Sequence, residues 1–406
     1  MTTTDKKSRP LDVIVWGATG FTGQLVAEYL AAHAPKDLRW AIGGRSRAKL
    51  ESVRANIARP DLELIVGDAR DGKSLSEIVT RTKVMLTTVG PYEIHGKELV
   101  AACAEHGTDY CDLTGETPFV RAMIDAHHER AKATGARIVH CCGFDSIPSD
   151  LGTLALQESA ISKYGEPCSR VGFYVMKMKG GASGGTIATM INLAETMTKD
   201  PGVRKIAGNP YALVPGERGP DGRDQMGVRF DPDLGRWTGP FVMAAINTRI
   251  VRRSNALLGY RYGKDFRYAE TISTGRGVKG WFGATALSAG MGAFAGALSV
   301  GPMRRFLASR VLPKPGEGPS KEKRDSGMFD IKLIGHTNDG RRVTANVRGT
   351  SDPGYGETSK MISESAIALA RDEANADGGV LTTASCLGMK LVTRLRATGM
   401  TFATEP

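Results

Sequence analysis

Three glycines, Gly17, Gly20 and Gly23, follow a short apolar run and lead into a stretch with helical periodicity. Residues 13–16 predict a buried parallel strand, and residues 24–32 predict a helix. Gly17 and Gly20 lack the side chain that would keep the backbone away from a phosphate. Gly23 lets the helix pack closely on its strand. The free amides at the start of the helix favour an anion. An ordinary strand-to-helix turn is the alternative. The residues predicted to hold a pyrophosphate are Gly17, Ala18, Thr19, Gly20, Phe21, Thr22 and Gly23.

The second predicted strand, residues 38–43, is followed by Arg45 and Ser46. An acidic residue at this place would accept a hydrogen bond from the ribose 2′-hydroxyl of NAD, whereas arginine pairs with a 2′-phosphate and serine can donate to it. The sequence therefore predicts NADPH as the cofactor. The alternative is that Arg45 is a solvated loop charge.

Ligands of open α/β sheets lie beyond the carboxyl ends of the strands, so the later strand ends complete the predicted site. The strand at 62–67 ends at Asp68 and Ala69, which we expect to border the adenine. The strand at 137–142 ends at Gly143 and Phe144, which are also predicted cofactor residues. The residues that follow the strand at 83–87, and that we expect near the nicotinamide, are Thr88, Val89, Gly90, Pro91 and Tyr92.

Strand and helix patterns alternate along residues 1–150, and this alternation predicts an α/β protein. Its first domain, residues 1–150, should be Rossmann-like, with a doubly wound parallel sheet of six strands. From residue 151 the pattern changes to a second, α+β domain over 151–350. Within it, residues 328–348 predict a hairpin that joins the strand at 170–178. Residues 351–406 predict a helical segment that returns to the first domain.

Two stretches of the second domain have more than one interpretation. Residues 180–186 form a second glycine-rich helix start, which could hold an anion or a carbonyl group, or could be a flexible turn. Residues 200–240 are rich in Gly, Pro, Asp and Arg with little periodicity, and so long an irregular stretch predicts a lid, an arm or a mobile loop.

The 406 residues include six cysteines without a CxxC pair, and the N-terminus does not resemble a secretory segment. We therefore expect a reducing cytoplasm and no metal site. Of the net charge of +11, a balance of +9 lies between Arg249 and Arg310, where eleven Lys and Arg face only Asp265 and Glu270. Without a nucleic-acid-binding motif, this cluster fits an anionic membrane or an acidic substrate better than nucleic acid.

Residues 281–303 contain no charge, although they are flanked by Lys279 and Arg304, and they include a GxxxG pair at Gly292 and Gly296. One interpretation is a hairpin or helix that lies in a membrane interface or lines an apolar substrate channel. Plain core and a membrane-spanning helix are the alternatives. The first interpretation suits a lipid-like substrate.

Several long motifs are similar to the saccharopine dehydrogenase family, and within it to the trans-acting enoyl reductases, whose type member acts in phthiocerol and phenolphthiocerol dimycocerosate synthesis. The likeness covers nearly the whole chain. The segments that carry it are residues 15–23, 44–46, 88–92, 108–116, 142–150, 238–241, 247–256 and 379–382.

The resemblance implies an NADPH-dependent reductase that saturates a carbon–carbon double bond in a polyketide-derived or other complex lipid. Such a reaction must stabilise an enolate and protonate the α-carbon, and Tyr92 and Asp145 are the candidates, each expected chiefly to position other groups. Expected partners are a hydrophobic lipid or polyketide substrate, an anionic membrane contacted peripherally and a second copy in a homodimer. The expected location is the cytoplasm, at the inner face of the plasma membrane.

Three other functions stay open. A short-chain dehydrogenase would use a Tyr-x-x-x-Lys pair, which Tyr260 and Lys264 match by chance within a glycine-containing stretch. A saccharopine dehydrogenase-like oxidoreductase would act on another substrate. A non-catalytic, membrane-surface protein would bind NADPH only as a structural ligand.

Overall fold

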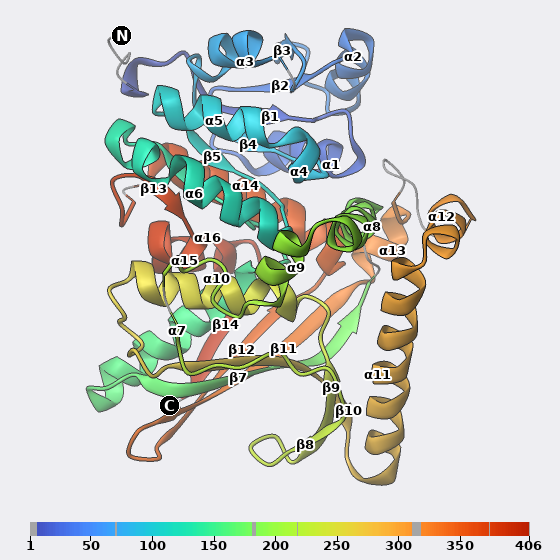
Figure 1. The fold of residues 1–406 in the computed structure, drawn as a ribbon. Helices are drawn as coiled ribbons and strands as arrows, with labels where there is room; N and C mark the ends of the chain where they lie inside the picture. Colours follow the sequence, from blue (N-terminus) through green and yellow to red (C-terminus); the bar gives the residue numbers. More distant parts are fainter. Residues whose placement is uncertain are drawn as a thin grey trace.

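The computed structural model describes residues 6–69, 71–180, 184–216, 218–310, 318–372 and 374–405. It contains two seven-stranded sheets, one above the other in Figure 1, with helices between and around them. In spatial order the first sheet contains β13 (Gly379–Leu381), β6 (Arg137–Val139), β5 (Asp109–Cys111), β4 (Thr82–Thr87), β1 (Leu11–Trp16), β2 (Trp40–Gly44) and β3 (Glu63–Val66). The second contains β14 (Thr401–Glu405), β12 (Arg342–Gly349), β11 (Met328–Thr337), β7 (Cys168–Lys179), β10 (Arg267–Gly275), β9 (Arg236–Pro240) and β8 (Arg229–Asp231).

The first sheet is the predicted doubly wound sheet, but it has seven strands instead of six, because β13 from the C-terminal segment pairs with β6. Every neighbouring pair of its strands is parallel, and the winding reverses at β1, which pairs with β2 on one side and β4 on the other. Val13, Ile14 and Val15 are completely buried, because helices cover both faces of a parallel sheet. The Rossmann-like fold class is therefore confirmed.

Helices cover the first sheet on both faces. Buried side chains of α1, α2 and α14 share one hydrophobic core, and those of α3, α5 and α6 share the other. These helices are α1 (Phe21–His33), α2 (Arg47–Asn56), α3 (Gly72–Val79), α5 (Lys97–His106), α6 (Thr117–Thr134) and α14 (Thr358–Arg371). The short elements of this part are η1 (Lys6–Ser8), α4 (Tyr92–His95) and the π-helical turn η2 (Pro353–Glu357).

The second sheet is mixed. β7 pairs in parallel with β10 and antiparallel with β11, and the β11–β12 hairpin joins β7 as predicted. The remaining helices are α7 (Ile147–Tyr164), α8 (Gly184–Lys199), α9 (Pro201–Gly208), α10 (Ala244–Leu257), α11 (Gly277–Ser299), α12 (Gly301–Arg310), α13 (Lys321–Asp325), α15 (Thr383–Cys386) and α16 (Gly388–Ala397). Of these, α7 packs on β11, β12 and β14.

The two halves of the molecule are interleaved along the sequence. The predicted boundary at residue 150 falls inside α7, which follows β6 of the first sheet and packs against the second. The carboxyl of Asp150 accepts hydrogen bonds from the Thr383 hydroxyl at 2.7 Å and the Ala384 amide at 2.8 Å. The C-terminal segment supplies β13 to the first sheet and β14 to the second.

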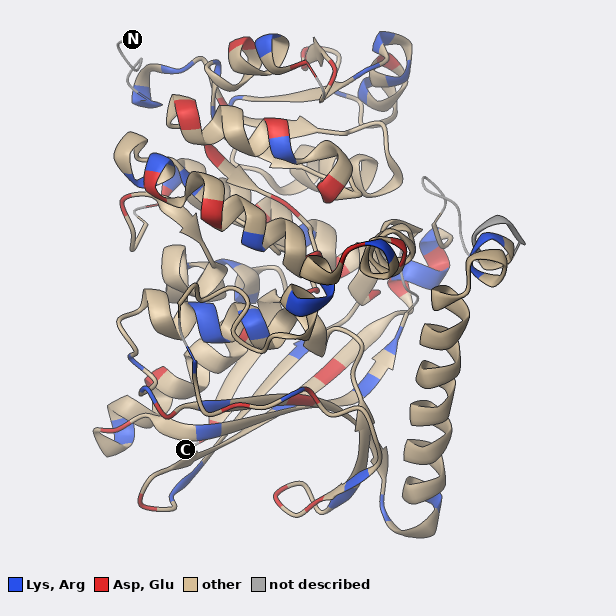
Figure 2. Cartoon of the chain, viewed as in Figure 1, with Lys and Arg blue, Asp and Glu red and all other residues tan. Residues whose placement is uncertain are grey.

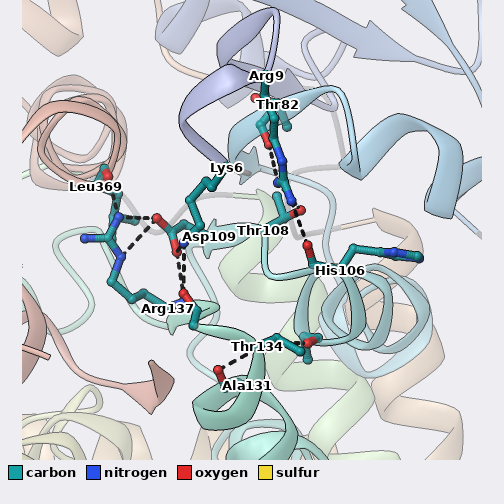
Figure 3. Close-up of polar contacts among 12 residues, drawn as sticks. Lys6, Arg9, Thr82, His106, Thr108, Asp109, Ala131, Thr134, Arg137 and Leu369 are labelled. Atoms are coloured by element: carbon teal, nitrogen blue, oxygen red, sulfur yellow. Dashed lines mark hydrogen bonds and ion pairs between the residues drawn. The ribbon is translucent and has the colours of Figure 1, made fainter. Parts of the chain in front are cut away.

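A polar cluster at the amino ends of β5 and β6 fixes α14 and η1 to the first sheet (Figure 3). Asp109 accepts from the ammonium of Lys6 at 2.7 Å and also pairs with Arg137. The guanidinium of Arg137 donates to the carbonyl of Leu369 in α14 at 2.7 Å. This cluster holds the sheet together at the edge opposite the strand ends that bind ligands in such folds.

The basic cluster of the sequence is partly internal. Arg249, Arg252 and Arg253 of α10 are buried, with at most 5% of each residue exposed. The guanidinium of Arg252 pairs with Asp221 at 2.8 Å, and that of Arg253 donates to the carbonyl oxygens of Leu213 and Val380 at 2.6 Å each. The interpretation as surface charge is therefore wrong for these three arginines.

The same arginines hold part of the irregular stretch over residues 200–240 against α10. Its described part contains α9, β8 and β9, and Arg249 pairs with Asp224. Because buried guanidinium groups donate to the carbonyl and carboxylate oxygens of residues 207–224, this part is fastened to α10. The expected lid, arm or mobile loop is thus a segment that packs on α10 over residues 207–224.

The uncharged stretch at 281–303 forms most of α11, which runs along one side of the molecule (Figure 1). Only Gly280, Ala284 and Leu298 of this helix are buried. The alternative that placed this stretch in the core is therefore wrong.

Candidate active site

The glycine turn between β1 and α1 contains two glycines that packing requires and one that faces open space. Gly17 has a φ of +88°, and a Cβ atom there would lie 2.5 Å from a methyl group of Val89. A Cβ at Gly23 would overlap the Gly17 carbonyl, which shows how closely α1 approaches the turn. At Gly20, the N-cap of α1, a Cβ would meet only that carbonyl, at 3.4 Å. The turn thus leaves room for a phosphate beside the free amides of the helix start.

The ends of β2 and β3 lie side by side next to this turn. The Gly67 amide donates to the Gly44 carbonyl at 3.2 Å, which brings Asp68 close to Arg45 along the sheet edge. Arg45 is exposed, and the Ser46 hydroxyl oxygen caps α2 by accepting from the Lys49 amide at 3.4 Å. Ala69 is buried just after Asp68. Arg45 has no ion-pair partner among the described residues, so its role at a 2′-phosphate stays a prediction.

We expect NADPH to bind at least about tenfold more tightly than NADH, which corresponds to about 1.4 kcal/mol. Replacing Arg45 with alanine removes the cation that distinguishes the two cofactors, so the preference should disappear through weaker NADPH binding. Titration by nicotinamide fluorescence measures both affinities. Arg204→Ala, which removes an exposed arginine from α9, is the matched control and should keep the preference. Equal affinities of the wild-type protein for the two cofactors contradict the assignment.

A cavity of about 330 Å³ lies beside the predicted nicotinamide end of the turn. It combines strand-end residues of the first sheet with apolar side chains from β7, α8 and the β9–α10 connection. Its lining includes the predicted site residues Thr22, Thr88, Gly90, Tyr92, Phe144 and Asp145. Its remaining lining is Leu113, Gly115, Met178, Gly180, Gly185, Thr189, Met190, Leu193, Phe241, Val242, Met243, Ala245, Ile246, Pro353, Gly354 and Thr358.

Tyr92 has the contacts of a positioning residue. Its hydroxyl donates to the Thr87 carbonyl at 3.2 Å and accepts from the Leu113 amide at 3.1 Å. Burial raises the pKa of this hydroxyl well above its usual value of 10.0. The Glu116 carboxylate accepts from the Tyr92 amide at 2.8 Å and from the Thr189 hydroxyl of α8 at 3.1 Å. Tyr92 therefore holds the loop after β4 in place, and its proton is already committed to the backbone.

Asp145 is the other ionisable side chain among the described residues that line the cavity. Burial raises the pKa of its carboxyl to about 7, and the negative charge of Asp112 adds to this effect. Asp112 is itself held by the Tyr110 hydroxyl at 2.9 Å and a ring nitrogen of His140 at 2.7 Å. Asp145 thus carries a transferable proton near neutral pH.

The threonine hydroxyls of the lining are mostly occupied within the protein. Thr88 donates to the Gly17 carbonyl at 3.3 Å, and Thr358 donates to the Pro353 carbonyl at 2.7 Å. None of the described lining residues is Lys or Arg, so the cavity offers no cation to a substrate carboxylate. A partly buried acid in an apolar cavity suits proton delivery to an uncharged acyl chain.

Sequence reasoning missed most of the apolar lining, because scattered Met, Leu and Phe residues carry no local signal. It did single out residues 180–186, of which Gly180 and Gly185 line the cavity, while 181–183 lie outside the described residues. Tyr260 and Lys264 lie between α10 and β10 and do not line this cavity, which agrees with the chance match.

A doubly wound sheet, a glycine turn and an apolar cavity at the strand ends are features of nicotinamide-dependent oxidoreductases. Residues 13–139 match the saccharopine dehydrogenase NADP binding domain. The chain is 40% identical over 415 residues to the trans-acting enoyl reductase of Mycobacterium bovis (strain BCG / Pasteur 1173P2), covering 98% of each protein. A relative from Mycobacterium tuberculosis (strain ATCC 25618 / H37Rv), named for the same activity, is 43% identical over 412 residues, again covering 98% of each.

The chain belongs to the trans-acting enoyl reductase family, and it is an NADPH-dependent oxidoreductase. The predicted family, cofactor and enzyme class are thereby confirmed. Yeast saccharopine dehydrogenase (L-Glu forming) from Saccharomyces cerevisiae has a similar fold, with a TM-score of 0.54 at 12% identity over 97% of this chain and 99% of that one.

Proposed function

We propose that the protein reduces the carbon–carbon double bond of an enoyl group on a lipid or polyketide chain, with the chain bound in the apolar cavity. The observation that carries this proposal is the combination of an apolar lining with Asp145, whose pKa burial raises to about 7. A saccharopine-like substrate carries several charges, and the described lining offers no cation to pair with its carboxylates.

The glycine turn would hold the pyrophosphate of NADPH, and Arg45 its 2′-phosphate. When bound, NADPH supplies the hydride for the β-carbon and is thereby oxidised to NADP⁺. Asp145 donates its carboxyl proton to the α-carbon, so that one hydride and one proton convert the double bond into a single bond. Met190, Leu193 and Phe241 exclude water from the acyl chain, and Tyr92 keeps the loop after β4 in position.

The test is turnover of the full chain with NADPH and crotonyl N-acetylcysteamine thioester. We expect loss of NADPH fluorescence and a product that has gained two hydrogens. NADPH deuterated at the transferable C4 position should place its deuterium on the β-carbon. The matched control is incubation of the protein with saccharopine and NADP⁺, which should give no turnover.

Two results contradict the proposal. Turnover of saccharopine alone would assign the other substrate class, and tight NADPH binding without any turnover would support a non-catalytic protein. The predicted peripheral contact with an anionic membrane, the location at the inner face of the plasma membrane and the homodimer remain proposals.

A further inference from the structure

The helices α11 and α12 carry an unusual share of the exposed apolar side chains. Among the described residues, seven of the fourteen large apolar side chains that are exposed belong to these two helices or to the residue between them. The exposed fraction reaches 70% at Val278, 61% at Phe282 and 56% at Phe306. We name six of these residues the apolar face: Val278, Trp281, Phe282, Val300, Met303 and Phe306. Phe294 is left out, because helical spacing places it on the side of α11 that packs on the protein.

One stripe of α11 is packed against the protein. Leu287 lies against Gly239 of β9, Gly283 lies against Thr274 of β10, and Ala284 is completely buried. By length and composition α11 could cross a bilayer. Crossing would break the contacts with β9 and β10, whereas lying flat in an interface keeps them and uses the exposed side chains.

The charges that α11 and α12 themselves carry have one sign. Arg276 and Lys279 stand at the start of α11, and Arg304 and Arg305 stand in α12, whereas no Asp or Glu occurs between residues 271 and 310. Figure 2 shows α11 as a long helix that is tan apart from basic colour near its lower end, with further basic residues in α12. Arg304 pairs loosely with Glu195 of α8, at 3.9 Å.

We propose that the apolar face docks on an anionic bilayer, with Lys279 and Arg305 at the lipid headgroups. Anionic headgroups complement these cations, and the aromatic side chains can enter the interface. A second copy of the chain is a poorer occupant, because either parallel or antiparallel pairing of α11 and α12 brings cations against cations.

The docked face adjoins the cavity through α8. This helix packs against both α11 and α12, and its Thr189, Met190 and Leu193 line the cavity. Met178 and Val242, each 46% exposed, continue the apolar lining outward. We infer that an acyl chain held in the membrane enters the cavity past α8 without crossing water. This route rests on the proposed enoyl reductase activity.

The experiment is sedimentation of the NADPH-bound full chain with vesicles of phosphatidylcholine, alone or mixed with phosphatidylglycerol. We expect binding to the mixed vesicles only, weakened by salt. Lys279→Glu together with Arg305→Glu should lower the partition coefficient at least about 25-fold, because each cation contributes about fivefold. Lys36→Glu with Lys264→Glu makes the same charge change at exposed lysines elsewhere and should stay near the wild-type value.

A second pair separates apolar insertion from charge. Trp281→Ser with Phe282→Ser should weaken binding at both low and high salt. Wild-type protein that ignores mixed vesicles at low salt overturns the proposal. So does a dimer in solution that the Trp281→Ser and Phe282→Ser pair dissociates, because it assigns the face to a second copy.

Turnover distinguishes this inference from the proposed function. The Lys279→Glu and Arg305→Glu variant should reduce soluble crotonyl thioester at the wild-type rate but lose activity on a long enoyl chain held in mixed vesicles. Wild-type protein that binds vesicles but reduces neither substrate refutes the proposed function and leaves the docking surface standing. Equal loss on both substrates refutes delivery from the membrane.

Discussion

Gly20→Val should fold normally and lose at least about 100-fold in NADPH affinity, which corresponds to about 2.7 kcal/mol. The Gly20 backbone has φ −79° and ψ 163°, an extended conformation that valine adopts readily. A Cβ there meets only the Gly17 carbonyl, at 3.4 Å, so we expect the valine methyl groups to enter the space proposed for the pyrophosphate. Fluorescence titration with NADPH measures the affinity, and thermal unfolding measures the fold.

The control for this variant is Gly208→Val in α9, where a Cβ also meets open space and no cofactor is expected. It should bind NADPH like the wild-type protein. Gly23→Ala should instead lower stability, since its Cβ overlaps the Gly17 carbonyl. Wild-type affinity in a folded Gly20→Val protein would show that the turn does not hold the phosphates.

Asp145→Asn should lower kcat/KM for the enoyl substrate by about 100-fold or more, because the amide cannot deliver the proton that general acid catalysis needs. In the wild-type enzyme, kcat/KM should be constant below the Asp145 pKa of about 7 and fall tenfold per pH unit above it. The variant should lack this break while binding NADPH normally. A purely structural role for Asp145 would leave the break in the pH profile of the variant.

The same carboxyl links stability to pH. Its pKa is raised from 3.8 to about 7 by burial, so the folded protein binds a proton that the unfolded chain releases between these values. The stabilising contribution of the protonated form is complete below pH 3.8 and is lost as the pH rises through about 7. Asp145→Asn should remove this component from the pH dependence of the free energy of unfolding. An unchanged pH dependence in the variant would contradict the raised pKa.

Local sequence signals were sufficient for the nucleotide-binding half. A strand, a glycine turn and a helix follow each other within residues 11–33, and Arg45 comes directly after the next strand. These features depend on neighbouring residues, because the free helix amides, the glycine conformations and the buried strand are all set within a short stretch of chain. The sequence by itself therefore determined the fold class and the preference for NADPH.

Only the tertiary structure decided what the scattered residues do. The guanidinium groups of Arg252 and Arg253 look like surface charge in the sequence, but they are buried against Asp221 and backbone carbonyls far away in the chain. Met190 and Phe241 become neighbours in one cavity, and α11 stays exposed although it is uncharged. Burial and charge pairing depend on contacts between distant segments, so no local pattern of residue types can reveal them.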